Sequence, residues 1–344
     1  MKTKGCCKLF VWLILLSFLF SCSSSNESAT QDQSYLGTHY FTSITGSYLK
    51  GALPQTTGSA SVGTVTISGS VIAGGLCIVN ITPSTSLSEL YVTADDSNTD
   101  GYYKIPLSSS SASNGSYTLY LQMSRELNKN FVIKMAALTT SGQITAWLSK
   151  TLHYVKAGTG ELQVSLTFDK SKDLDLYLVE PNGHIIYYED SLAYLYKYRD
   201  RIPELAQYIN DTRVNGLDLD SNAGCRVDGI NNENISIYKE FMQAGSYQVW
   251  VNEYQNCDPT CDVQWAVSVL YQGNLVTPDK GPNPATGSFD KSFIDNKLKN
   301  EILTNSRAVK VMEFSIADGV IVKSSTQNMK ARDNIASSPN KKEK

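Results

Sequence analysis

The sequence predicts an all-β protein with two antiparallel β-sandwich domains of the immunoglobulin-like type, the second carrying a short helical insertion. Runs in which apolar and polar residues alternate recur along most of the chain, as is typical of strands. Turn-forming pairs such as Asp100-Gly101 and Asn114-Gly115 separate these runs. Helical spacing of apolar residues occurs in one segment only. Many short strands divided by regular turns favour a sandwich.

The first predicted domain covers residues 62–160. Its expected strands are short and closely spaced, and they lie at residues 65–67, 76–81, 90–92, 102–107, 117–121, 131–138, 144–148 and 152–155.

The second predicted domain covers residues 161–323. It opens with a strict alternation that places four apolar side chains on one buried face, namely Leu162, Val164, Leu166 and Phe168. Further strands are expected at 173–179, 247–251, 263–271 and 308–316. In the last of these the apolar phase slips between Val311 and Met312, which predicts a bulge there.

One segment of the second domain has helical rather than strand spacing. Residues 191–200 and 203–209 repeat apolar residues at intervals of three and four. Ser191 is a suitable N-cap, and Pro203 is suited to the first turn of a helix. We expect two short helices inserted at one end of the sandwich.

The N-terminus resembles a bacterial lipoprotein signal. Three lysines precede the apolar run 9–20, which is shorter than the roughly 20 residues that a bilayer-spanning helix needs. The end of this run and the two residues after it, Leu19-Phe20-Ser21-Cys22, resemble a lipobox. This predicts a signal peptide over 1–21 and lipidation of Cys22. We expect anchorage to the cell envelope, at the outer membrane, while the sequence leaves open whether the body faces the periplasm or the outside.

Polar segments flank the two predicted domains. Residues 22–61 are assigned to a lipidated polar tether, and residues 324–344 to a disordered polar tail. Removal of the signal takes three lysines and no acid from 30 basic and 33 acidic residues. The mature chain then has a net charge of about −6, which argues against a nucleic-acid partner.

Four cysteines remain in the predicted folded part, and a disulfide is permitted outside the cytoplasm. We expect Cys257 to pair with Cys225 or with Cys261, and Cys77, which lies in an apolar run, to stay a buried thiol.

Oxygen-rich motifs in the second domain predict a cation site. Asp173 and Asp175 are two residues apart on a strand whose Leu174, Leu176 and Leu178 are expected to fill the core, so both carboxylates leave the opposite face. A strand end and turn at residues 218–224 and another turn at residues 231–234 add further oxygen ligands, and hard oxygen ligands without histidine suit calcium. The alternative is that these are solvated turns, in which Asp and Asn are favoured locally. The predicted ligands are Asp173, Asp175, Asp218, Asp220, Asn222 and Glu233.

A family resemblance covers residues from about 162 to 316. The motifs that carry it are, in order, Asp173-Leu174-Asp175-Leu176-Tyr177-Leu178, Glu180-Pro181-Asn182-Gly183, Gly216-Leu217-Asp218-Leu219-Asp220, Glu233-Asn234-Ile235 and Gly245-Ser246-Tyr247. Together they resemble the YfaP-like secreted domain of unknown function, a β-sandwich module. The resemblance implies that the acidic motifs form an ion site. The chain departs from the family by inserting residues 190–215, and by having Asn232 where proline is usual.

Tyrosines in and before the insertion form a second candidate site. If exposed, they would make a platform for a glycan or a protein partner, whereas the alternative is that they dock the helices onto the sandwich. The residues are Tyr187, Tyr188, Tyr194, Tyr196 and Tyr198.

These patterns together predict a lipid-anchored envelope protein that acts as a non-catalytic binding or assembly module, with an envelope protein or a glycan as partner and calcium as a structural ion. The competing interpretation is an envelope hydrolase, a peptidase or glycosidase, with its carboxylates in the acidic loops. No recognisable nucleophile or metallohydrolase motif surrounds His153 or His184.

Overall fold

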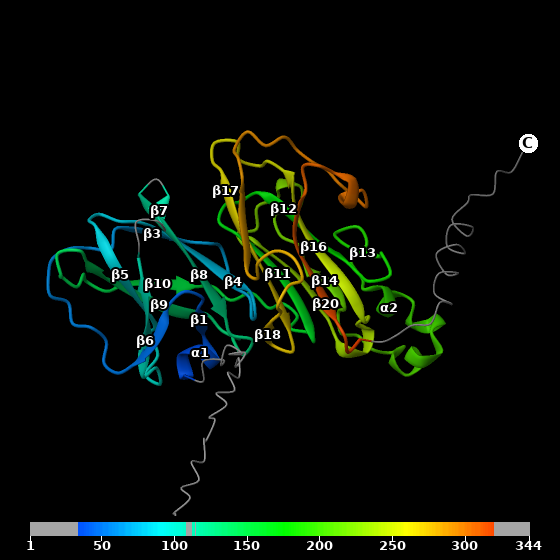
Figure 1. Cartoon of the computed structure of the whole chain (residues 1–344), viewed down its shortest axis with the longest axis horizontal. Coiled ribbons are helices and arrows are strands. Elements are labelled where there is room, and N and C mark those ends of the chain that lie inside the picture. Colours follow the sequence, from blue (N-terminus) through cyan, green and yellow to red (C-terminus); the bar gives the residue numbers. More distant parts are fainter. Residues whose placement is uncertain (1–33, 108–111, 114, 320–344) are drawn as a thin grey trace, which may run out of the picture. The chain divides into compact units, whose positions relative to one another are not determined.

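The computed structural model describes residues 34–107, 112–113 and 115–319. The predicted signal peptide, Cys22, the first part of the predicted tether and the predicted tail at 324–344 lie outside these ranges. Within them, regular structure is almost entirely β, and every ladder is antiparallel. The prediction of an all-β, immunoglobulin-like sandwich protein is therefore confirmed (Figure 1).

Two sheets form the first sandwich. One has the strand order β1-β8-β4-β3 with β7 beside β8, and the other has the order β10-β9-β5-β6-β2. Apolar side chains from both sheets meet in one core. The strands are β1 (Phe41–Ser43), β2 (Ser47–Lys50), β3 (Thr64–Ile67), β4 (Leu76–Thr82), β5 (Leu87–Ala94), β6 (Gly101–Pro106), β7 (Ala112–Ser113), β8 (Ser116–Met123), β9 (Phe131–Thr139) and β10 (Leu148–Leu152).

The tether assignment over 22–61 is wrong for residues 35–50. This stretch forms helix α1 (Tyr35–His39) and strands β1 and β2, which pair with β8 and β6. Leu36 and Phe41 are fully buried in the core of the first sandwich. The polar composition that indicates a tether ends before Tyr35, so apolar residues beyond it are available for burial.

The expected strands at 144–148 and 152–155 are also wrong. The structure has one strand, β10, across the interval between them, paired with β9. Ile144 makes only an isolated bridge with Leu138. Apolar residues mark both ends of this segment, but the ladder to β9 runs through the polar residues in the middle, because β10 is an edge strand.

The second sandwich also has two sheets. Their orders are β14-β15-β11-β17-β18, with β19 beside β17, and β13-β12-β16-β20. The strands are β11 (Leu162–Phe168), β12 (Asp173–Val179), β13 (Ile185–Ile186), β14 (Gly216–Leu219), β15 (Asn232–Ile237), β16 (Gly245–Gln255), β17 (Val263–Tyr271), β18 (Asn274–Leu275), β19 (Ala285–Phe289) and β20 (Val309–Ile316).

Two sequence predictions for this sandwich are confirmed, one in its first strand, β11, and one in its last strand, β20. The four apolar residues of β11 are fully buried in its core. The register of β16 with β20 shifts where Val249 opposes Met312 and Trp250 opposes Lys310, so Val311 is the extra residue of the predicted bulge. Sequence patterns missed β19, because its residues Ala285–Phe289 alternate weakly and lie among turn residues.

The helical insertion is confirmed, although it is built mostly of short turns. It contains α2 (Tyr194–Lys197), η2 (Arg199–Arg201) and η3 (Pro203–Tyr208), and Pro203 begins the last of these as predicted. The N-cap of α2 is Ala193 rather than Ser191. Ser191 is used differently, since its carbonyl accepts a hydrogen bond from Leu217 N at 2.7 Å. Other single turns are η4 (Ala223–Cys225), η5 (Lys239–Phe241) and η6 (Ile302–Thr304).

No helix in the described part of the chain is long and apolar enough to cross a membrane.

Strand β11 is buried on both faces, which sequence alternation alone does not predict. Its polar face packs against the first sandwich. Gln163 Nε2 donates to Ala73 O at 2.8 Å, and Thr167 Oγ1 donates to Leu76 O at 3.0 Å. A small apolar contact accompanies these bonds, made by Leu76, Ile78, Ala266 and Tyr120. The contact between the two sandwiches is therefore largely polar, and within the described residues Gln163 Oε1 is buried in it without a hydrogen-bond partner.

Tyr247 fixes the start of β16 through its hydroxyl group. The hydroxyl donates to Gln243 O at 2.7 Å and accepts from Gln243 N at 2.9 Å, while the ring stacks on Phe314. Both bonds are buried, so the backbone N–H and C=O groups of Gln243 both depend on this one side chain for a partner.

We expect Tyr247→Phe to lower the free energy of unfolding by about 1–3 kcal/mol, because it leaves buried backbone groups without partners while keeping the ring. Urea unfolding monitored by tryptophan fluorescence measures this loss. Tyr117, the second residue of β8 and also buried, is the control. No hydrogen bond of the Tyr117 hydroxyl is found within the described residues, so an equal loss in Tyr117→Phe would contradict the assignment.

Candidate functional site

Carboxylates gather where the first half of β12 lies near β15. Leu174 and Leu176 point into the core, as the sequence predicts. Asp173 precedes Leu174, and Asp175 lies between the two leucines. Both aspartates are almost fully buried. Asp175 Oδ2 accepts a hydrogen bond from the hydroxyl of Tyr177 at 3.1 Å, and Asp173 Oδ2 accepts one from Gly224 N at 2.8 Å.

Glu233, on β15, reaches across to the same place. Its Oε2 accepts a hydrogen bond from Leu176 N at 2.6 Å, so it satisfies a backbone group of β12 that has no strand neighbour there. Its side chain is only 1% exposed, and Oε1 has no hydrogen-bond partner within the described residues. A carboxylate oxygen buried without a donor is costly, which makes Oε1 the least satisfied atom of the site.

Asp220 completes the group, which we call the carboxylate cluster and define as Asp173, Asp175, Asp220 and Glu233. The Asp220 carboxyl lies within hydrogen-bonding reach of Glu233. Two ionised carboxylates have no proton to share, so this contact is favourable only if one is protonated or a cation lies between them. Asp220 is the solvent-exposed member of the cluster.

The pKa values of all four carboxyls are raised. Burial is the main cause for Asp175 and Glu233, whose pKa values lie well above the usual range, and the negative charges of their neighbours add to it. Burial also raises the pKa of Asp173 to about 6. Asp220 is exposed as a whole residue, but partial desolvation of its carboxyl group raises its pKa as well. The cluster therefore holds protons more strongly than isolated acids do.

Two of the six predicted ligands lie elsewhere. Asp218 accepts from Gly158 N and from Asn234 Nδ2, so it holds the segment that joins the two sandwiches. Asn222 supports the loop after β14: its Nδ2 donates to Lys172 O at 3.0 Å, and its Oδ1 accepts from Asp228 N at 3.1 Å. Both are structural residues in this arrangement.

Sequence reasoning missed two supporting groups. Tyr177 donates to Asp175, and Asn252 on the neighbouring strand β16 hydrogen-bonds the same carboxyl. Asn252 lies directly opposite Asp175 in the ladder, so a correct pairing of β12 with β16 would have identified it. In the arrangement described, no three side chains among His, Cys, Asp and Glu are placed to hold a metal ion.

A disulfide joins Cys225 to Cys257, which is one of the two pairings that the sequence leaves open. Cys225 ends η4, whose residue Gly224 donates to Asp173, so the disulfide ties the loop at the cluster to the end of β16. Cys77 is a buried thiol and burial raises its pKa, while Cys261 is a partly exposed thiol.

The five tyrosines do not form an exposed platform. Tyr187, Tyr194 and Tyr196 are buried. Tyr187 stacks on Tyr177 at a centroid distance of 5.6 Å, and Tyr196 packs edge-on against Phe241 at 5.0 Å. Tyr188 and Tyr198 are half-buried against the core. The platform prediction is wrong, because the rings supply the apolar surface that docks the insertion onto the sandwich.

No protein-family model matches the sequence, and no curated protein is similar to it. Among solved structures, one to which the chain is similar is described as the central fibronectin-III array of RIM-binding protein. The match has 9% sequence identity, covers 69% of this chain and 89% of that chain, and has a TM-score of 0.21. The fold assignment therefore depends on the strand order and packing described above.

We expect the carboxylate cluster to make the protein less stable as pH rises. The folded-state pKa values exceed those of the unfolded chain, so from about pH 4 upward the folded protein holds more protons than the unfolded chain does. Stability falls as the pH rises through the folded-state pKa values, about 6 for Asp173 and higher for the more deeply buried acids, because these protons are then lost. In chelator, the melting midpoint should be lower at about pH 8 than at about pH 5.

The matched variant for this measurement is Glu233→Gln, which keeps the shape of the side chain and removes one buried charge. It should reduce the difference in midpoint between the two pH values. A wild-type midpoint that rises steadily from about pH 5 to about pH 8 would show that the cluster does not control stability.

Proposed function

We propose that this chain is a lipid-anchored component of the cell envelope that acts as a non-catalytic binding or assembly module, with an envelope protein or a glycan as partner. The YfaP-like resemblance of residues from about 162 to 316 fits this role. The N-terminal sequence, with its lysines, short apolar run and Cys22, supports the anchor. Two packed β-sandwiches are suited to presenting surfaces rather than enclosing a substrate. The second sandwich is stabilised by a cation at the carboxylate cluster.

The observation that carries the cation proposal is the unpartnered Oε1 of Glu233. It is buried beside Asp175 and Asp220, and burial, with the repulsion between these acids added to it, raises the pKa of Asp175 and of Glu233. A divalent cation would supply the positive charge that no nearby donor gives to Oε1. All the oxygens available are carboxylate, hydroxyl and amide oxygens, which are the ligands that calcium prefers.

Calcium binding requires the carboxylates to turn from their present orientation, since no three of them are placed around a common point within the described residues. Asp220 is exposed, so its side chain has room to move. Asp175 and Glu233 are held by Tyr177 and by the backbone of Leu176, which leaves one oxygen of Glu233 directed at the cluster. The ion would thus link β12 to β15 and to the loop after β14.

The hydrolase interpretation gains no support from the cluster. A raised pKa suits a general acid. However, Asp175 is 4% exposed and Glu233 is 1% exposed, so neither carboxyl can contact the scissile bond of a substrate. Two surface hollows of about 230 Å³ are lined by other residues, around Asp95 and around Met312. We therefore propose that the carboxylates are structural.

We expect calcium to raise the melting midpoint of the chain made without residues 1–21 at about pH 7.5, and to have little effect near pH 5, where protons occupy the carboxylates. A concentration of 100 times the dissociation constant contributes about 2.7 kcal/mol. Glu233→Gln, which removes the unpartnered oxygen's charge, should reduce the shift. An unchanged midpoint at saturating calcium would remove the ion from the proposal and leave the anchor untouched.

Replacement of the predicted lipidation site should release the protein from membranes. In Cys22→Ala the thiol that carries the acyl chains is gone, so the protein should move from the membrane fraction to the soluble fraction after cell lysis without detergent. Replacement of Cys77, which is buried in the first sandwich, tests whether loss of any thiol has this effect. Continued sedimentation of Cys22→Ala with membranes would show that the anchor lies elsewhere.

A further inference from the structure

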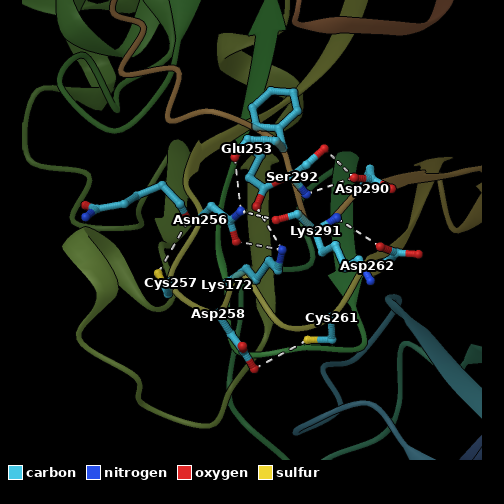
Figure 2. A network of polar contacts seen from close by, with 12 residues as sticks. Lys172, Glu253, Asn256, Cys257, Asp258, Cys261, Asp262, Asp290, Lys291 and Ser292 are labelled. Atoms are coloured by element: carbon cyan, nitrogen blue, oxygen red, sulfur yellow. Dashed lines mark hydrogen bonds and ion pairs between the residues drawn. The ribbon is translucent and has the colours of Figure 1, made fainter.

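A lysine, a glutamate and an asparagine meet inside the second sandwich, beyond the carboxylate cluster. Lys172 immediately precedes β12, Glu253 lies near the end of β16, and Asn256 follows β16. Lys172 Nζ is 2.8 Å from Asn256 Oδ1 and 3.3 Å from Glu253 Oε1, and the side chains of Lys172 and Glu253 are both 0% exposed. Figure 2 shows the three side chains converging.

The register of β12 with β16 explains how two residues three apart reach one lysine. In a regular strand, Glu253 and Asn256 would point to opposite faces. Here Asp173 opposes Gln255 while Leu174 opposes Glu253, so the strand has one extra residue between them. The bulge returns Asn256 to the face of Glu253, and that face also carries Lys172.

The amide of Asn256 is held in a fixed orientation. Its Nδ2 donates to Lys291 O at 2.8 Å and to Phe293 O at 3.0 Å, and its backbone N–H donates to Asp295 Oδ1 at 3.0 Å. These bonds turn the carbonyl oxygen, and the Cγ that bears it, toward Lys172. The lysine and the amide are therefore preorganised for contact, which greatly raises their effective concentration.

Glu253 is placed to move protons between them. Apart from Lys172, neither of its carboxylate oxygens has a hydrogen-bond partner within the described residues. Burial raises the pKa of Glu253. Its Oε1 lies 3.3 Å from Lys172 Nζ, within reach of a proton of the ammonium, and loss of that proton leaves the amine, which is the nucleophilic form of lysine.

We propose that Lys172 and Asn256 are joined in the folded protein by an amide bond between Nζ and Cγ. Glu253 accepts a proton from the lysine ammonium, and the amine then attacks Cγ. The second proton lost from Nζ passes to Nδ2, the bond between Cγ and Nδ2 breaks, and ammonia leaves. Glu253 returns its proton to the ammonia, which departs as ammonium. No electrons are transferred, and no other reactant is consumed.

The bond would close the same end of the sandwich that the disulfide closes. It ties the start of β12 to the end of β16, while Cys257, the residue after Asn256, is tied to Cys225 on the loop at the carboxylate cluster. The two links differ in chemistry, because reduction opens the disulfide and leaves an amide intact. This difference makes the amide bond measurable on the full chain.

The test is a tryptic peptide map of the full chain after complete reduction and alkylation. A modified Lys172 resists trypsin, so we expect a branched species in which residues 171–197 are joined to residues 240–280. Its mass should equal the sum of the two peptides less one molecule of ammonia. The proposal would be overturned if the wild-type chain gave peptides 173–197 and 240–280 as separate species, with Asn256 unchanged.

Three variants test the roles of the residues. Lys172→Arg keeps the charge but cannot form this bond, and Glu253→Gln keeps the shape but cannot accept the proton, so both should lose the branched species. Asp258→Asn changes an acid of the same loop that contacts Thr260 and Cys261, and it should retain the species. Persistence of the branch in Glu253→Gln would overturn the role of Glu253. If a variant fails to fold, the wild-type map alone still decides whether the bond exists.

Discussion

Removal of charged side chains from water at one end of the second sandwich is the constraint on which its architecture depends. Asp175, Glu233, Lys172 and Glu253 are all almost completely buried there. Each must be matched by a proton, a hydrogen bond or an opposite charge, because an isolated buried charge is strongly unfavourable. The bulge in β16, the disulfide and the loop after β14 all lie at this end, and together they hold the partners in place.

Local patterns in the sequence predicted those features that depend only on neighbouring residues. The alternation of β11, the inward direction of Leu174 and Leu176, the start of η3 at Pro203 and the bulge at Val311 are all of this kind. Each follows from the repeat of side chains along a single strand or turn. Such a repeat can be read without knowing which strands are neighbours.

Features that depend on strand pairing were not predictable in the same way. Asp218 and Asp220 are two apart, which in a regular strand gives a shared face, but the register of β14 with β15 shifts between Leu217 and Leu219 and separates them. The turn expected around Asn231–Asn234 is mostly strand β15, so Glu233 points inward while its neighbours face the first sandwich. Lys172 and Glu253 come together because β12 pairs with β16, and no local sequence motif predicts that pairing.

The polar face of β11 has a consequence for the order in which the protein assembles. Gln163 and Thr167 can exchange their bonds to the first sandwich for bonds to water at little cost, unlike a face of leucine or phenylalanine. A second sandwich that has folded but has not yet docked onto the first would therefore expose the polar, hydrated face of β11 to other chains. Such a surface resists non-specific association with other chains, and it recognises the first sandwich through the positions of its hydrogen bonds.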